Sequence, residues 1–294
     1  MTVVIAIPGS EQQAMKLAAR LGVDQIAAEV RRFPDGELYV RLDRELAGHD
    51  AILVGSLYPD PAERFLTVAF LAATARDHGA RKVGLVAPYL AFMRQDVQFK
   101  PGEGVTSRYF ARLVSASVDW MVTVDPHLHR HASLDGLYTI PTGIARSAPA
   151  IASWIATEVA RPYLIGPDAE SAQWVSAVAE RCGAPFVILE KTRRGDRDVS
   201  ISGALDAAWQ DHTPVVIDDI VSTGKTMIEA TRQLRAAGSE APMCVAIHAV
   251  FADTVLEELV SAGAAGIVTC NTISHASNRI CVAEHIADAA KLYL

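Results

Sequence analysis

The strongest chemical signal in the chain is an acidic pair followed by a small polar turn. Asp218 and Asp219 come directly after the apolar run Pro214–Ile217, and Ser222–Thr226 leads into a segment with helical spacing. Free backbone N–H groups at a helix start, with serine and threonine hydroxyls beside them, can hold a dianionic phosphate. Neighbouring carboxylates can accept hydrogen bonds from ribose hydroxyls. The segment therefore predicts a site for a sugar phosphate.

Two other interpretations of this turn are weaker. Gly224-Lys225-Thr226 matches the end of a P-loop, but that motif needs a glycine where Asp219 stands. A carboxylate at that position would repel the β-phosphate that the backbone of a P-loop surrounds. A plain helix cap would explain one aspartate but not two in succession.

Two further polar segments follow apolar runs. Arg94 and Gln95 come after Val83–Ala87. The planar guanidinium of arginine can stack or contact phosphate, and the glutamine amide can both donate and accept hydrogen bonds, so the pair suits a nucleotide. His127 follows another apolar run, and His129 and His131 alternate with it. A zinc site made by these three histidines is an alternative, but three ligands from one short run without a carboxylate form an uncommon geometry.

These segments together resemble the ribose-phosphate diphosphokinases, also called phosphoribosyl pyrophosphate synthetases. The resemblance rests on Phe33–Glu37, Pro88–Asp96, Val124–His127, Ile165–Ala169, Glu190–Asp198 and Asp218–Thr226, which stand in the family's order. The last segment also resembles the type I phosphoribosyltransferases, which use the activated sugar that the diphosphokinases make. The Phe33 segment and the Arg94-Gln95 pair have no use in a phosphoribosyltransferase, so they favour the diphosphokinase.

The resemblance implies a reaction and a set of site residues. The reaction transfers a diphosphoryl group from MgATP to the 1-hydroxyl of ribose 5-phosphate, giving 5-phosphoribosyl 1-diphosphate and AMP. The implied ATP-binding residues are Phe33, Asp35, Gly36, Glu37, Arg94, Gln95 and Asp96. The implied residues for ribose 5-phosphate are Asp218, Asp219, Ser222, Thr223, Gly224, Lys225 and Thr226. The resemblance also implies Mg²⁺ near His127 and Asp168, catalytic contacts of Lys191 and Arg193 with the phosphates, and a homo-oligomer.

The chain departs from many family members at Glu170-Ser171, where glycines are common, and at Lys225. These departures leave two alternatives open. One is a type I phosphoribosyltransferase that is indifferent to ATP, and the other is a non-catalytic relative that regulates partner enzymes. The retained Lys191 and Arg193 oppose the second alternative.

Strands alternating with helices must position these residues. Strands are predicted at Val3–Ile7, Ala51–Val54, Val83–Ala87, Trp120–Val124, Tyr163–Ile165, Phe186–Leu189, Pro214–Ile217, Val245–Ala249 and Ile267–Thr269. Helices are predicted at Glu11–Leu21, Ala62–His78, Ala150–Val159, Ser171–Cys182 and Met227–Ala237, several followed by a capping glycine (Gly22, Gly79, Gly183, Gly238). Apolar strands between helices predict parallel sheets covered on both faces. We expect an α/β fold with two similar phosphoribosyltransferase-like domains, residues 1–145 on the nucleotide side and 146–294 with the ribose-phosphate turn.

The composition excludes several classes of protein. The 294 residues are 50% hydrophobic and 21% charged, which is typical of a globular chain and not of a disordered one. A net charge of −7 gives no positive field for nucleic acid. The apolar run near the N-terminus is too short for a signal peptide, and no run approaches a membrane span, so we expect a cytoplasmic protein without a membrane partner. The four scattered cysteines indicate neither a disulfide framework nor a thiolate zinc site.

Overall fold

The computed structural model describes residues 1–128, 130, 131, 133–189, 191–194, 198–201, 209 and 211–294, with the backbone alone at 191–194, 198–201 and 253. The chain forms two compact units. The N-terminal unit comprises Met1–Arg146, Thr272–Ser274 and Val282–Leu294, and the C-terminal unit comprises Ser147–Asn271 and His275–Cys281.

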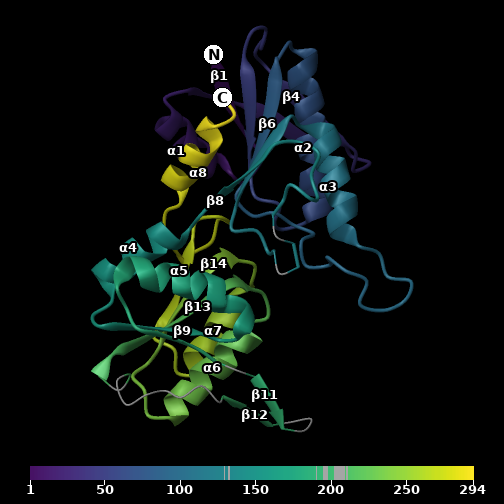
Figure 1. The fold of residues 1–294 in the computed structure, drawn as a ribbon. Coiled ribbons are helices and arrows are strands. Elements are labelled where there is room, and N and C mark those ends of the chain that lie inside the picture. Colours follow the sequence, from purple (N-terminus) through teal and green to yellow (C-terminus); the bar gives the residue numbers. More distant parts are fainter. Residues whose placement is uncertain (129, 132, 190, 195–197, 202–208, 210) are drawn as a thin grey trace. The chain divides into compact units, whose positions relative to one another are not determined.

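The N-terminal unit is built on a sheet of six parallel strands in the order β2-β1-β5-β6-β7-β8. The strands are β1 (Thr2–Ala6), β2 (Asp24–Ile26), β5 (Asp50–Val54), β6 (Lys82–Ala87), β7 (Trp120–Val124) and β8 (Thr142–Ala145). Its helices are α1 (Glu11–Leu21), α2 (Pro61–Asp77), α3 (Thr106–Ser117) and α8 (Ala283–Lys291). Helices α1 and α8 pack together on one side of the sheet, and α2 and α3 pack together on the other (Figure 1).

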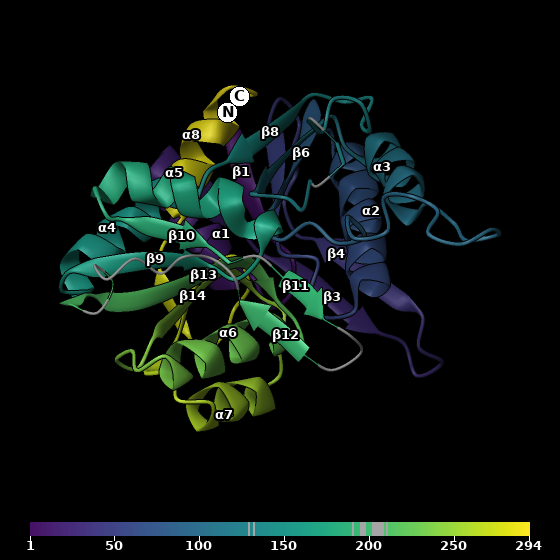
Figure 2. The ribbon, with the colours of Figure 1, turned by 60° about the horizontal axis from the view of Figure 1, so that its bottom comes forward.

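The C-terminal unit repeats this plan with six parallel strands in the order β10-β9-β13-β14-β15-β16. The strands are β9 (Pro162–Gly166), β10 (Phe186–Ile188), β13 (Thr213–Val221), β14 (Met243–Ala249), β15 (Gly266–Cys270) and β16 (Asn278–Ile280). Its helices are α4 (Ala148–Glu158), α5 (Ala172–Cys182), α6 (Lys225–Ala236) and α7 (Asp253–Ser261), with the short 3-10 helix η1 (Ala169–Ser171). Figure 2 shows the sheet between the α4–α5 pair and the α6–α7 pair.

Two hairpins stand outside these sheets. Strands β3 (Ala28–Arg32) and β4 (Leu38–Leu42) form one antiparallel pair, and β11 (Lys191–Arg194) and β12 (Asp198–Ile201) form the other. The predicted α/β fold with two similar domains is confirmed by the shared sheet order. The expected boundary between the two domains, at residues 145 and 146, remains a prediction.

The helix ends follow the predicted glycine signals. Gly22, Gly79, Gly183 and Gly238 all have a positive φ, between 67° and 89°, just past the helices they follow. Glycine takes this left-handed conformation without the strain that a Cβ would add, so it lets the chain turn back toward the next strand.

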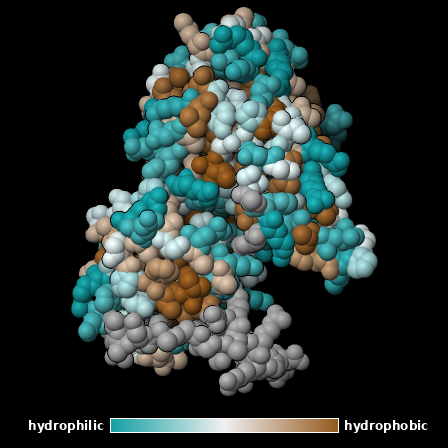
Figure 3. Space-filling model, in the orientation of Figure 1, coloured by the Kyte–Doolittle hydropathy of each residue, from teal (hydrophilic) through white to brown (hydrophobic). Residues whose placement is uncertain are grey.

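The core of each unit consists of the apolar strands that the sequence predicts. The side chains of Ile5, Leu53, Leu85 and Val122 are completely or almost completely buried in the N-terminal unit, and Tyr163, Ile165 and Val216 belong to the core of the C-terminal unit. On the visible face, polar side chains predominate and apolar ones gather in small groups (Figure 3). Among the described residues, no helix has the length and hydropathy needed to cross a bilayer.

One close contact between strands gives a test of the packing. Gly84 on β6 lies beside Trp120 on β7, and a Cβ at Gly84 would stand 2.1 Å from the indole ring. We expect Gly84→Ala to destabilise the protein by about 1–3 kcal/mol, because the ring is already packed and must move. Urea unfolding measures the effect. Gly136→Ala is the matched control, since a Cβ there meets open space, and a loss as large as that of Gly84→Ala would contradict the packing argument.

Candidate active site

The predicted sugar-phosphate turn lies at the carboxyl end of a central strand. The sequence predicts a strand that ends at Ile217, but β13 continues to Val221, so the acidic pair is part of the strand. Gly224 then turns the chain into α6 with a φ of 69°, and a Cβ there would stand 2.4 Å from Cγ1 of Val255. Glycine is therefore required twice at this position, by its conformation and by the close approach of α7.

The acidic pair is held by its own backbone. The amide of Asp219 donates to Oδ1 of Asp218 at 2.9 Å, and the amide of Ile220 donates to Oδ1 of Asp219 at 2.7 Å. Burial raises the pKa of Asp218 to about 8, and the charges of Asp219 and Asp168 add to the effect. The structure thus brings three sequence-predicted carboxylates into one electrostatic group within the C-terminal unit.

Asp168 also orders the turn after β9. Its Oδ1 accepts hydrogen bonds from the amides of Glu170 and Ser171 at 3.1 and 3.3 Å, and the Ser171 hydroxyl donates to the Asp168 carbonyl. A Cβ at Gly166 would stand 2.5 Å from the Ser171 Oγ. The Ser171 side chain can therefore occupy this position only because residue 166 is glycine. Ser171, one of the two residues that depart from the family pattern, therefore closes a capping box with Asp168.

The Phe33 segment forms the tip of the β3–β4 hairpin. The amide of Phe33 donates to the Glu37 carbonyl at 2.8 Å, and the Glu37 amide donates to Oδ1 of Asp35 at 3.1 Å. The Phe33 ring remains 41% exposed, although it meets Tyr39 edge to face and Arg31 lies over both rings. An exposed ring on a turn that is held by hydrogen bonds is suited to stacking against a planar base.

The loops after β6 and β7 hold the other predicted nucleotide and metal residues. Arg94 is exposed, whereas Asp96 is buried and accepts a hydrogen bond from Nη1 of Arg130 at 2.8 Å. Phe92 and Asp125 take positive φ values of 62° and 30°, which strain residues that have a Cβ. Such strain persists where the surrounding structure enforces it and often accompanies function.

His127 is half-buried two residues after Asp125, whose carboxylate accepts a hydrogen bond from Arg146 at 3.2 Å. His129, part of the alternative zinc hypothesis, lies outside the described residues. Within the part of the chain that the structure describes, no three His, Cys, Asp or Glu side chains are grouped to hold a metal ion. Arg130 and Arg146 were missed by sequence reasoning, because nothing in their spacing links them to Asp96 and Asp125.

The predicted residues thus fall into two groups. The N-terminal unit carries the Phe33 hairpin and the loops with Arg94 and His127, and the C-terminal unit carries Asp168 and the sugar-phosphate turn. Lys191 and Arg193 stand two positions apart on β11, where the backbone alone is described. No hydrogen bond or ring contact found among the described residues joins Phe33, Asp35 or Glu37 to Arg94–Asp96.

The raised pKa of Asp218 predicts a stability change with pH. A carboxyl whose pKa is higher in the folded state than in the unfolded chain binds its proton on folding, so its contribution is complete below about pH 4 and is lost as the pH rises through about 8. Asp218→Asn should therefore be more stable than the parent protein by a margin that grows between these values. Thermal unfolding of the metal-free protein measures it. Glu240→Gln, an exposed acid of the same unit, should leave the profile unchanged, and equal profiles for parent and Asp218→Asn would contradict the prediction.

Known proteins match both halves of the chain. The profile of the N-terminal domain of ribose phosphate pyrophosphokinase matches residues 2–117, and that of the phosphoribosyl transferase domain matches residues 134–285. The chain is 32% identical to a ribose-phosphate pyrophosphokinase of Methanopyrus kandleri over 98% of each chain. It is also 32% identical to one of Methanosarcina acetivorans, over 98% of this chain and 99% of the relative.

A solved structure has the same fold. The phosphoribosylpyrophosphate synthetase from Mycobacterium smegmatis covers 99% of this chain with 97% of its own length, at a TM-score of 0.84 and 22% identity. Two domain profiles in the expected order and relatives matched over nearly the whole chain lead to one conclusion: this chain belongs to the ribose-phosphate pyrophosphokinase family of diphosphotransferases.

Proposed function

We propose that the chain transfers the β,γ-diphosphoryl group of MgATP to the 1-hydroxyl of ribose 5-phosphate, giving 5-phosphoribosyl 1-diphosphate and AMP. The observation that carries the proposal is the acidic pair and phosphate-binding turn at the carboxyl end of β13 in a member of this family. In the bond exchange, the sugar oxygen attacks the β-phosphorus, and the bond from that phosphorus to the α-phosphate oxygen breaks. The hydroxyl proton is released and AMP leaves.

The C-terminal unit is proposed to bind the sugar. Amides at the start of α6 and the hydroxyls of Ser222, Thr223 and Thr226 would hold the 5-phosphate, as expected for a helix N-terminus that follows a strand. Asp218 and Asp219 would accept hydrogen bonds from the ribose hydroxyls and fix the direction of the 1-hydroxyl. This positioning matters because phosphoryl transfer depends on alignment and charge neutralisation more than on covalent help.

The N-terminal unit is proposed to bind ATP. The exposed Phe33 ring would stack on adenine, and Arg94, also exposed, would contact the phosphates. The proposal includes a homo-oligomer with the adenine site at a subunit contact. It is supported by the exposed Phe33 ring, which lies on a hairpin that is not part of the six-stranded sheet.

The carboxylate group of the C-terminal unit fits magnesium. Its donors are hard oxygen atoms. Burial is the main cause of the raised pKa of Asp218, and the charges of Asp219 and Asp168, which a cation would offset, raise it further. Mg²⁺ commonly binds through one or two protein groups together with substrate phosphates and water, so a cage of three side chains is not required. Asp168 is the residue of this unit that would hold it, and His127 is the metal-binding residue proposed for the N-terminal unit. A bound Mg²⁺ would supply charge neutralisation at the phosphate oxygens.

The assay for the proposal separates the adenine nucleotides formed from MgATP with and without ribose 5-phosphate. We expect AMP that appears only with the sugar, together with an equal amount of the diphosphate ester. ADP would instead establish transfer of a single phosphoryl group. Nucleotide binding without any reaction would favour the regulatory alternative, and consumption of phosphoribosyl diphosphate with a nucleobase would favour a phosphoribosyltransferase.

Lys191 is proposed to stabilise the negative charge that develops at the transferring phosphoryl group. Lys191→Ala should lower kcat by at least about 100-fold, which is the usual loss when one preorganised charge-stabilising donor is removed. Lys16→Ala, on the exposed side of α1, is the matched control and should keep kcat within about twofold. Thermal unfolding verifies that both variants are folded. A Lys191→Ala enzyme with near-normal turnover would remove Lys191 from the mechanism.

Phe33 is proposed to act through stacking. Phe33→Ala should raise the KM for ATP by roughly 5- to 150-fold, since stacking of a base on an aromatic ring contributes about 1–3 kcal/mol. Phe33→Tyr should restore most of the affinity. Steady-state kinetics at saturating ribose 5-phosphate measure the change. Phe186→Ala removes another exposed ring, on β10, and a similar rise in KM for that variant would show that the effect is not stacking at this site.

A further inference from the structure

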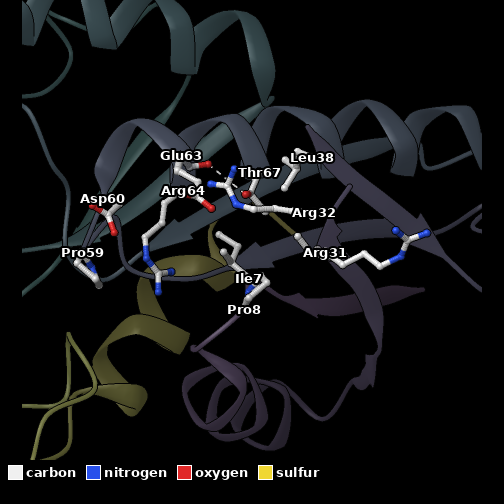
Figure 4. Close-up of a pocket in the computed structure, with 11 residues that line it drawn as sticks. Ile7, Pro8, Arg31, Arg32, Leu38, Pro59, Asp60, Glu63, Arg64 and Thr67 are labelled. Carbon is white, nitrogen blue, oxygen red and sulfur yellow. Dashed lines mark hydrogen bonds and ion pairs between the residues drawn. The ribbon is translucent and has the colours of Figure 1, made fainter. Parts of the chain in front are cut away.

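A second candidate site lies in the N-terminal unit. None of the residues proposed above for ATP, sugar or metal lines it, although Arg32 and Leu38 flank the Phe33–Glu37 turn. It is a cavity of about 280 Å³ (Figure 4). Ile7 and Pro8 line it just after β1, and Pro59 and Asp60 line it beyond the end of β5. Strands β1 and β5 are neighbours and run parallel, so the cavity lies at the carboxyl end of the sheet.

The cavity lies where the order of strands in the sheet reverses. From β1 the chain crosses to β2 on one side, whereas from β5 it continues to β6, β7 and β8 on the other. The sheet order therefore reverses between β1 and β5, and open α/β sheets bind their ligands at this reversal, outside the carboxyl ends of the strands. In the C-terminal unit the equivalent reversal lies between β9 and β13, where Asp168 and the sugar-phosphate turn stand.

Arg64 lines the cavity and has a donor without a partner. It belongs to the first turns of α2, and its Nη1 is buried without a hydrogen-bond partner among the described residues. Burial lowers the pKa of Arg64 despite the opposing charges of Glu11, Asp60 and Glu63. A buried guanidinium N–H that lacks an acceptor carries a desolvation penalty that an anionic ligand would relieve.

The other two arginines of the cavity are already engaged. Arg32 pairs with Glu63 and donates to the Gly36 carbonyl at 2.7 Å. Arg31 lies over the ring of Tyr39 at 3.9 Å, and Figure 4 shows it pointing away from the cavity. Figure 4 also shows Arg64 extending away from the Arg32–Glu63 pair, toward the side of Pro59 and Asp60.

We propose that this cavity binds a small molecule that bears a phosphate group, with Arg64 as its main ligand. A guanidinium presents a planar fork of donors that matches two phosphate oxygens, and the pairing is strong where water is excluded. The ligand is free phosphate or a phosphate monoester, which share this chemistry. The proposal depends on the N-terminal unit alone and does not require the reaction proposed above.

The test measures phosphate binding to the full chain by isothermal titration calorimetry. Ser222→Ala with Thr226→Val serves as the background, because these changes weaken binding at the sugar-phosphate turn. Inorganic phosphate and glycerol 3-phosphate are the two probes, and the one that binds more tightly identifies the source. We expect saturable binding of at least one probe, and Arg64→Gln should weaken it at least tenfold.

Two variants make the result specific. Arg31→Gln removes an engaged arginine of the same cavity and should change the dissociation constant less than twofold. Asp60→Asn should tighten binding, since it removes a carboxylate near Arg64 while asparagine tolerates the positive φ of 55° at this position. If Arg64→Gln does not fold, Arg64→Lys and Asp60→Asn still test the proposal by weaker and tighter binding. Absence of binding by both probes, or equal effects of Arg64→Gln and Arg31→Gln, would overturn it.

Discussion

Parallel strand pairing is the constraint on which the candidate site residues of each unit depend. Every pair in the two six-stranded sheets is parallel, so each strand is followed by a crossover and all carboxyl ends lie at one edge. The loops after β6 and β7 are therefore neighbours in one unit, as are the ends of β9 and β13 in the other. Residues far apart in sequence, such as Asp168 and Asp218, come within electrostatic reach for this reason.

The carboxyl-end edge of the C-terminal sheet carries a group of negative charges that does not stabilise the fold. Burial is the main reason why the charged form of Asp218 is unfavourable, and repulsion from Asp219 and Asp168 adds to it. The amides of Asp219 and Ile220 offset only part of it. A chain selected for stability alone would replace one of these aspartates by a neutral residue. Their retention is understandable where a cation and sugar hydroxyls complete the group, and perturbed pKa values of this kind cluster at functional sites.

The sequence predicted the inner strands of both sheets and the apolar edge strand β10, but not the other edge strands. Fully buried parallel strands such as β5 and β6 appear as continuous apolar runs. The edge strands β2, β8 and β16 are short, and β2 and β16 mix polar and apolar residues, so no periodic signal marked them. Sequence also could not place α8, because an amphipathic helix does not specify its partner; here Tyr293, just beyond it, stacks on Trp120 of β7. The ion pairs of Arg130 with Asp96 and of Arg146 with Asp125 were not predictable either, because nothing in the spacing of these residues links them.

The two units share one topology but place different charged side chains at the reversal of the sheet order. At the reversal of the sheet order, the C-terminal unit gathers carboxylates, which favour a cation and hydroxyl groups. The N-terminal unit has an arginine with an unused donor at the same place, which favours an anion. Gly9 permits this arrangement, since a Cβ there would stand 3.2 Å from Nη2 of Arg64 and its φ is 81°. The fold thus provides the location twice, whereas the side chains on the loops decide what each location can bind.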